Sequence, residues 1–167
     1  MVYCAIGVWD DQTGTTIVFS EFLENAGTWS FEIKADKNLH SVNADLGKMI
    51  NQFIDEKGLQ FKVALISIYS EIAEKIINGA AIAAKTNLPV ITDFSAMDFA
   101  LGGSGDFFIS SAAKLQLSID QLSNSDKAIC VAFMGILRWR EEYNFLSSIT
   151  GASRNSIGGA LWMGQEA

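Results

Sequence analysis

The stretch AICVAFMGIL, residues 128–137, is the feature that most restricts how this chain can fold. If the stretch is helical, apolar side chains project from every side of the helix, and Ser123 or Ser125 is placed to cap its N-terminus. A helix that is apolar all round is buried, so other layers of structure must cover it. The run is also too short to span a bilayer, which needs about 20 residues. The sequence therefore predicts a layered fold with this helix near its centre.

Three short strands are predicted before residue 40. The segments VYCAIGVWD, TTIVFSEFLE and TWSFEIKAD are rich in strand-forming residues, and the last two alternate between apolar and polar positions. The turn-forming residues of DQTG and ENAG separate them, as in an antiparallel meander. Ile17, Phe19 and Phe22 are spaced nearly for one face of the second strand.

The pattern changes to helical spacing at His40. Apolar residues recur from Val42 to Phe53, and Gly58 is placed to end this helix. FKVALISIY and LPVITDF then indicate buried strands, with NGAAIAAKT as a helix between them. SEIAEKI is ambiguous between helix and loop, the path of residues 107–125 is not predicted, and GASRNSIGGALWMG ends the chain as turns and a short strand.

This order of elements predicts an α/β fold, a single ribonuclease-H-like lobe. We expect a mixed five-stranded sheet with helices on its faces, in which three antiparallel strands are continued by parallel ones. No internal repeat or linker divides the chain, so residues 1–167 are predicted to form a single domain.

Composition narrows the function classes. The net charge is −7 and no basic stripe is present, so the sequence predicts that nucleic acid is not a partner. Cys4 and Cys130 lie far apart in apolar stretches, which favours buried thiols in a reducing compartment over a disulfide. The single histidine, His40, is at no usual zinc-ligand spacing from them, and no metal site is expected. With no signal sequence or membrane span recognised, we expect a cytoplasmic protein.

Two local patterns allow a ligand site, and each has a plainer interpretation. The glycines of GGSG, residues 102–105, could let backbone N–H groups cradle a phosphate, or form an ordinary turn. Asp93 closes a predicted strand and Asp98 follows it, so both could face a crevice at the carboxyl ends of the strands. Acidic residues in a solvent-exposed loop with no ligand would give the same pattern. Glu71 and Glu74 would lie one turn apart if their segment is helical, and we interpret them as solvent-exposed residues with no role in a site.

The segment NGAAIAAKTNLPVITDFSAMDFALGGSG resembles a block of the anhydro-N-acetylmuramic acid kinases. A second segment, from AFMGILRW to the C-terminus, is similar to the end of those kinases, and the first hairpin gives a faint third match. The matching positions in the two main segments are Asn78, Gly79, Ala83, Thr86, Pro89, Val90, Asp93, Phe94, Asp98, Ala100, Gly102, Gly103, Gly105, Asn144, Ser148, Thr150, Gly151, Ala152 and Gly159.

The chain also departs from the pattern of these kinases. They have the actin-like ATPase fold, with two ribonuclease-H-like lobes and ATP in the cleft between them, and they are about twice as long. WDDQTGTT stands in place of their first phosphate loop, and Ser95 stands in place of an arginine. The segment with the catalytic base, the second phosphate loop and the second lobe are absent. Phosphoryl transfer depends on such positioning groups.

The resemblance implies a shortened, non-catalytic relative of these kinases that acts by binding. Its implied partners are a second copy of the chain in a homodimer, a full-length kinase, or an amino sugar of the cell wall, as in peptidoglycan recycling. Candidate ligand-binding residues are Asn78, Asp93, Asp98, Gly102, Gly103 and Gly105, with no catalytic residue identified and no cofactor expected. One alternative is an active ATP-dependent sugar kinase, using Mg-ATP, whose cleft is rebuilt by dimerisation. Another is a retained fold with an unrelated function.

Overall fold

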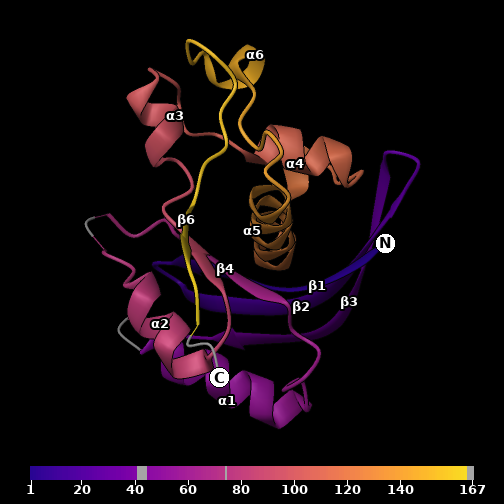
Figure 1. The fold of residues 1–167 in the computed structure, drawn as a ribbon, viewed down its shortest axis with the longest axis vertical. Helices are drawn as coiled ribbons and strands as arrows, with labels where there is room; N and C mark the ends of the chain where they lie inside the picture. Colours follow the sequence, from indigo (N-terminus) through magenta and orange to yellow (C-terminus); the bar gives the residue numbers. More distant parts are fainter. Residues whose placement is uncertain (41–44, 74, 165–167) are drawn as a thin grey trace.

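The fold is built on one mixed six-stranded sheet, seen in a computed structural model that describes residues 1–40, 45–73 and 75–164. The strand order is β3-β2-β1-β4-β5-β6 (Figure 1). The first three strands form the predicted antiparallel meander, β4 and β5 continue it in parallel, and β6 closes the sheet antiparallel to β5. The strands are β1 (Val2–Asp11), β2 (Gly14–Asn25), β3 (Thr28–Leu39), β4 (Leu65–Ser70), β5 (Val90–Thr92) and β6 (Ala160–Trp162).

Helices cover both faces of the sheet. The pair α1 and α2 lies on one face, and α5 lies on the other with α4 packed against it (Figure 1). Two separate hydrophobic cores result, one on each side of the sheet. The helices are α1 (Leu46–Lys57), α2 (Gly79–Thr86), α3 (Ala96–Ala100), α4 (Phe108–Lys114), the 3₁₀ turn η1 (Ile119–Gln121), α5 (Asn124–Trp139) and α6 (Ser147–Thr150).

The first helix begins later than its sequence pattern indicated. His40 follows β3, and α1 starts after Asp45, whose side chain accepts a hydrogen bond from Lys48 N. Val42, which we placed on this helix, lies outside the described residues. Gly58 ends α1 as predicted, with a φ of 64° in the left-handed region that favours glycine.

The predicted single apolar face on β2 is wrong. Ile17 and Phe19 point into the core beneath α1, whereas Phe22 points into the core beneath α5. Strand geometry explains this, because residues that differ by an odd number lie on opposite faces. The neighbouring β3 has a β-bulge beside Phe19 and Ser20, where Ala35 and Ile33 are the paired residues and Lys34 is skipped.

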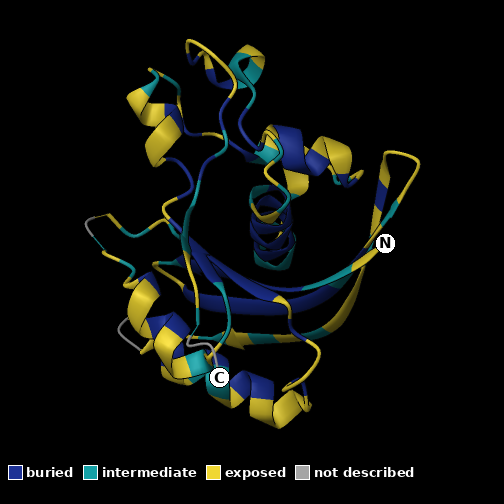
Figure 2. Cartoon of the chain, in the orientation of Figure 1, coloured by how far each residue is buried: buried dark blue, intermediate teal, exposed yellow. Residues whose placement is uncertain are grey.

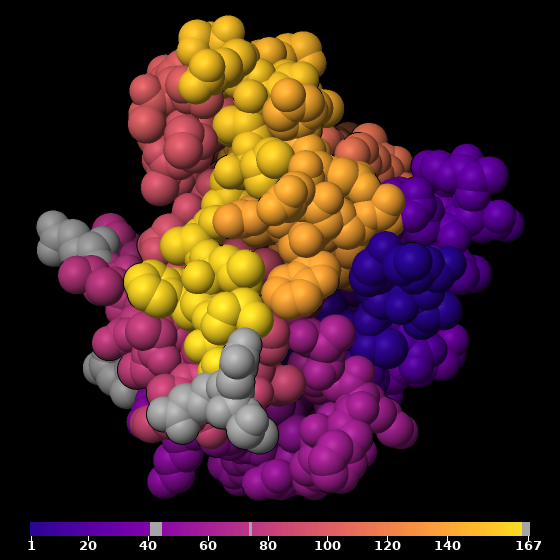
Figure 3. All heavy atoms as spheres, in the orientation of Figure 1, coloured from indigo at the N-terminus to yellow at the C-terminus, as the bar shows by residue number. Residues whose placement is uncertain are grey.

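The apolar stretch of residues 128–137 forms the buried part of α5, as predicted, and every residue in it is buried (Figure 2). Ser123 caps the helix through a capping box with Asp126. The C-terminal segment crosses one face of the molecule in the space-filling view, from α6 towards α2 (Figure 3). It contains β6, the short strand predicted near the end of the chain, which joins the sheet as a sixth strand where five were expected.

Glycines allow α5 to lie directly on the sheet. A Cβ on Gly7 of β1 would overlap the carbonyl oxygen of Ala128, and a Cβ on Gly135 of α5 would overlap the hydroxyl of Ser67 on β4. The backbones of helix and strands therefore approach more closely than side chains would permit.

Several smaller expectations are also settled by the structure. SEIAEKI is not helical where it is described, and residues 107–125 form α4 and the 3₁₀ turn before α5. Cys4 and Cys130 are free thiols, and burial raises the pKa of Cys130 to about 12. Within the described ranges, no helix is long and apolar enough to cross a membrane.

We predict that Gly135→Ala lowers the free energy of unfolding by about 1–3 kcal/mol, because the added methyl group overpacks the contact with β4. Gly47→Ala in α1 is the matched control, since the atom nearest to its new Cβ is in the flexible side chain of Lys85. Alanine is the better helix former, so the control should melt at or slightly above the wild-type temperature. Thermal melts followed by circular dichroism measure both, and equal effects would contradict the packing argument.

Candidate functional site

The buried carboxylate of Asp10 organises the polar groups at the carboxyl end of β1. Its side chain is fully buried. Oδ1 accepts a hydrogen bond from Thr15 Oγ1 at 2.8 Å, and Oδ2 accepts one from Ser70 Oγ at 2.7 Å and one from Lys75 Nζ at 2.7 Å. The backbone N–H of Glu71 donates to the Asp10 carbonyl at 2.8 Å. Asp10 thus links β1 to β2, β4 and the segment after β4.

Trp9 connects this end of β1 with α5, and Asp11 holds its indole ring. The Asp11 side chain accepts hydrogen bonds from the Trp9 indole at 3.0 Å and from Thr13 N at 2.8 Å. Partial burial raises the pKa of Asp11, but these hydrogen bonds and that from the Thr13 hydroxyl outweigh it and hold the pKa below its ordinary value. Lys127, in the first turns of α5, lies over the Trp9 ring with Nζ 4.7 Å from its centre.

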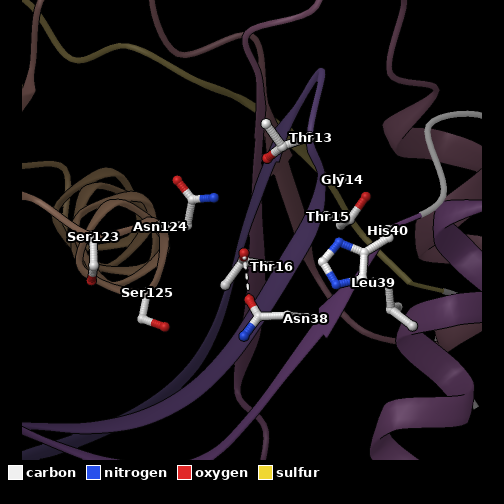
Figure 4. Close-up of a pocket in the computed structure, with 10 residues that line it drawn as sticks. All are labelled: Thr13, Gly14, Thr15, Thr16, Asn38, Leu39, His40, Ser123, Asn124 and Ser125. Atoms are coloured by element: carbon white, nitrogen blue, oxygen red, sulfur yellow. Dashed lines mark hydrogen bonds between the residues drawn. The ribbon is translucent and has the colours of Figure 1, made fainter.

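A cavity of about 430 Å³ lies where the N-terminus of α5 meets the β1–β2 turn and the end of β3 (Figure 4). We call it the α5 pocket. Gly14 is required in its wall, because φ is +141° there and a Cβ would overlap the Leu39 carbonyl. The lining is rich in hydroxyl, amide and imidazole groups and contains no carboxylate: Thr13, Gly14, Thr15, Thr16, Asn38, Leu39, His40, Ser123, Asn124 and Ser125.

The hydrogen bonds of the α5 pocket leave donors available to a ligand. Thr16 Oγ1 donates to Asn38 Oδ1 at 2.8 Å, and the Asn38 NH₂ group has no hydrogen-bond partner among the described residues (Figure 4). Asn124 and Ser125 occupy the first turn of α5, where backbone N–H groups have no partner within the helix. The Asn124 side chain extends from this turn towards the strands (Figure 4).

The acidic groups at the end of β1 do not fit a metal centre of the kind that many nucleases use, in which carboxylates hold two metal ions about 4 Å apart. Among the residues that the structure describes, no three His, Cys, Asp or Glu side chains lie close enough to hold a metal ion. The two oxygens of Asp10 are already paired with two hydroxyl groups and an ammonium group. No reaction step through a metal ion follows from these residues.

The structure brings four of the six sequence-predicted site residues together: Gly102, Gly103 and Gly105 belong to a loop beside Asp98, which is fully buried. Asp98 Oδ2 accepts a hydrogen bond from Gly105 N at 2.8 Å, and Oδ1 accepts one from Thr150 Oγ1 at 2.8 Å. A Cβ on Gly103 would overlap the Asp98 carboxylate. We call Asp98, the 102–105 loop and Thr150 the Asp98 clasp, because it joins two segments that are distant in the sequence.

The backbone N–H groups of the 102–105 loop, which we considered as an anion-binding cradle, all donate hydrogen bonds within the protein. The four N–H groups of Gly102, Gly103, Ser104 and Gly105 donate to Phe99 O, Asp98 O, Thr150 O and Asp98 Oδ2. The loop is therefore a turn held by the protein's own acceptors, which was the plainer of the two interpretations.

Asn78 and Asp93 lie outside the Asp98 clasp. Asn78 caps α2 by accepting a hydrogen bond from Ala81 N at 3.0 Å. Asp93 is exposed, has a left-handed φ of 54°, and lines a cavity of about 270 Å³ with Ser70 and Lys75. A ligand-binding role for these two residues stays a prediction.

Comparisons with known proteins identify the fold. No protein-family model and no curated protein sequence matches the chain. A structure of RuvC from Thermus thermophilus aligns with 93% of this chain and 100% of its own, with a TM-score of 0.54 and 14% identity. The fold is ribonuclease-H-like. T. thermophilus RuvC in complex with Holliday junction substrate aligns with 84% of this chain and 96% of its own, with a TM-score of 0.45 and 14% identity.

These comparisons overturn the kinase interpretation. The solved structure that aligns with the chain is of RuvC, and the predicted membership in the anhydro-N-acetylmuramic acid kinase family is wrong. The amino-sugar ligand, the kinase partner, the homodimer and the rebuilt kinase cleft were drawn from that resemblance and are withdrawn with it. The exclusion of nucleic acid is withdrawn as well, because it rested on the net charge of the chain. Net charge is a sum over the whole chain and does not describe one pocket.

Sequence reasoning missed Asp10, Lys75 and the residues of the α5 pocket. Asp10 closes an apolar strand, the same signal that drew attention to Asp93. Lys75 had no such signal, because it reaches Asp10 from 65 positions away. The polar lining of the α5 pocket comes from three separate segments, and only the folded sheet brings them together.

We predict that Asp98→Asn lowers the free energy of unfolding by about 1–3 kcal/mol. The NH₂ group of asparagine cannot accept a hydrogen bond, so either Gly105 N–H or the Thr150 hydroxyl would lose the acceptor to which it now donates. The matched control is Asp93→Asn, at an exposed position where asparagine tolerates the left-handed backbone. Urea unfolding of the two variants measures the difference. An Asp98→Asn protein as stable as wild type would show that the Asp98 clasp does not hold the fold.

Proposed function

We propose that this chain is a nucleic-acid-binding domain that holds a phosphate group of DNA in the α5 pocket. The observation that carries the proposal is the pocket's lining, which presents hydroxyl, amide and imidazole groups and the first turn of α5, with no carboxylate among the described lining residues. Such groups, together with helix N-termini, are those that contact phosphate and sugar in protein–DNA complexes. The fold shared with RuvC supports the proposal by analogy.

The charges around the α5 pocket support a weak, hydrogen-bonded mode of binding. The Asp10 carboxylate is paired with Lys75, and Lys127 is close enough to Asp11 to lower its pKa. The Asp126 carboxylate accepts hydrogen bonds from the Ser123 N–H and hydroxyl group. These three carboxylates and two lysines carry no net positive charge that would attract DNA from a distance, so binding would depend on hydrogen bonds at the pocket. The proposal includes a cytoplasmic location, in keeping with the two free cysteines.

We expect fluorescence anisotropy to show binding of a labelled four-way DNA junction with a dissociation constant of about 1–100 μM at low salt. Since no more than about two cations lie near the pocket, log K should fall with log[salt] with a slope no steeper than about −2. Matched duplex and single-stranded DNA in the same assay show whether the branched form is preferred. No anisotropy change up to about 100 μM protein would refute the proposal.

The variant Ser125→Glu tests whether the α5 pocket is the binding site. A carboxylate there repels phosphate but suits the helix dipole, so the protein should remain at least as stable as wild type while it loses about tenfold or more in affinity. Ser30→Glu adds the same charge at an exposed position on β3, away from the pocket. If both variants weaken binding equally, the effect comes from net charge and the assignment to the α5 pocket is wrong.

A further inference from the structure

Lys75 and Asp10 form an ion pair in which the carboxylate is fully buried and the lysine side chain is 22% exposed. The lysine comes from the segment between β4 and α2, and Nζ lies 2.7 Å from Asp10 Oδ2. Other bonds fix the segment beside Asp10, including Glu71 N to Asp10 O and Ile72 N to Ser70 Oγ. The ammonium group therefore reaches the carboxylate from a backbone that is itself tied to β1 and β4.

This pair occupies the position at which a metal ion would be expected if the chain were a metal-dependent nuclease. Ligands of open α/β sheets gather at the carboxyl ends of the strands, where Asp10 and Ser70 end β1 and β4. Asp11 and Glu71 line a further cavity of about 270 Å³ at the same edge, so other carboxylates lie nearby. A carboxylate has about four lone-pair sites, and two hydroxyl groups and the ammonium group use three of those on Asp10.

We propose that Lys75 is a resident cation at the end of β1, which neutralises Asp10 in place of a divalent metal ion. Binding of Mg²⁺ or Mn²⁺ to Asp10 Oδ2 would require the ammonium group to leave, because Ser70 and Lys75 already donate to that oxygen, and Lys75 would then lose its carboxylate partner. The ion pair makes this end of the sheet independent of metal. The inference concerns the carboxylate chemistry of the chain and does not depend on nucleic-acid binding in the α5 pocket.

The first experiment measures thermal melts of the wild-type chain in EDTA and in about 5 mM Mg²⁺ or Mn²⁺, with a calorimetric Mn²⁺ titration alongside. Because a metal that binds the folded state raises its melting temperature, we expect a shift of less than about 1 °C and no saturable heat. Saturable Mn²⁺ binding that is lost in Asp10→Asn would overturn the proposal. No DNA is present, so the result is separate from the test of the proposed function.

The second experiment removes the resident cation. Lys75→Met keeps the length of the side chain but leaves Asp10 charged and buried, so its melting temperature in EDTA should fall by about 6 °C or more. Mn²⁺ should restore part of that loss, because the carboxylate is then open to a metal ion. The matched control is the double variant Asp10→Asn/Lys75→Met, which removes both charges and should not respond to Mn²⁺.

Two results would overturn the role of Lys75. One is a Lys75→Met protein that melts at the wild-type temperature, and the other is a folded Lys75→Met protein that gains nothing from Mn²⁺. If Lys75→Met does not fold in EDTA or in Mn²⁺, the wild-type titration and its Asp10→Asn control decide the proposal.

Discussion

The close contact of α5 with β1 and β4 is the constraint on which the rest of the structure depends. It requires glycine on both sides, at Gly7 in the strand and Gly135 in the helix. Because the backbones meet there, the first turn of α5 is held beside the end of β1, with Lys127 over Trp9. The α5 pocket is a consequence of this contact, since its walls are the helix N-terminus and the strand ends that the helix lies against.

Most of the fold could be predicted from local patterns. The meander, the buried character of residues 128–137, the Ser123 cap and the ribonuclease-H-like order of elements depend on periodicity and turn residues that a sequence displays directly. Two errors came from relying on the spacing of apolar residues alone. Asp45 caps α1 where the apolar spacing suggested an earlier start, and the opposite orientations of Ile17 and Phe22 follow from strand parity.

The site was less predictable because its residues are distant in the sequence. Asp10 could have been found, whereas its partner Lys75 is recognisable only in the folded chain. The misleading motif also has a physical explanation. Asp98 and Gly105 come from one of the two segments that suggested a kinase and Thr150 from the other, and both Gly105 and Thr150 donate a hydrogen bond to Asp98. The glycines are thus needed to form the turn, and the aspartate is needed to hold that turn through buried hydrogen bonds. The motif therefore reflects how this part of the chain packs.

The late position of α5 in the chain has a consequence for synthesis. The helices α1 and α2 follow the meander closely and can cover one face of the sheet early, but α5 begins only at Asn124. At about 5–20 residues per second, the ribosome takes several seconds to deliver α5 after β1–β5 have been synthesised. During that interval Trp9, Phe22 and Trp29 lack the helix that buries them in the mature protein. The nascent chain therefore exposes an aromatic surface that a chaperone can recognise, and this exposure ends when α5 docks.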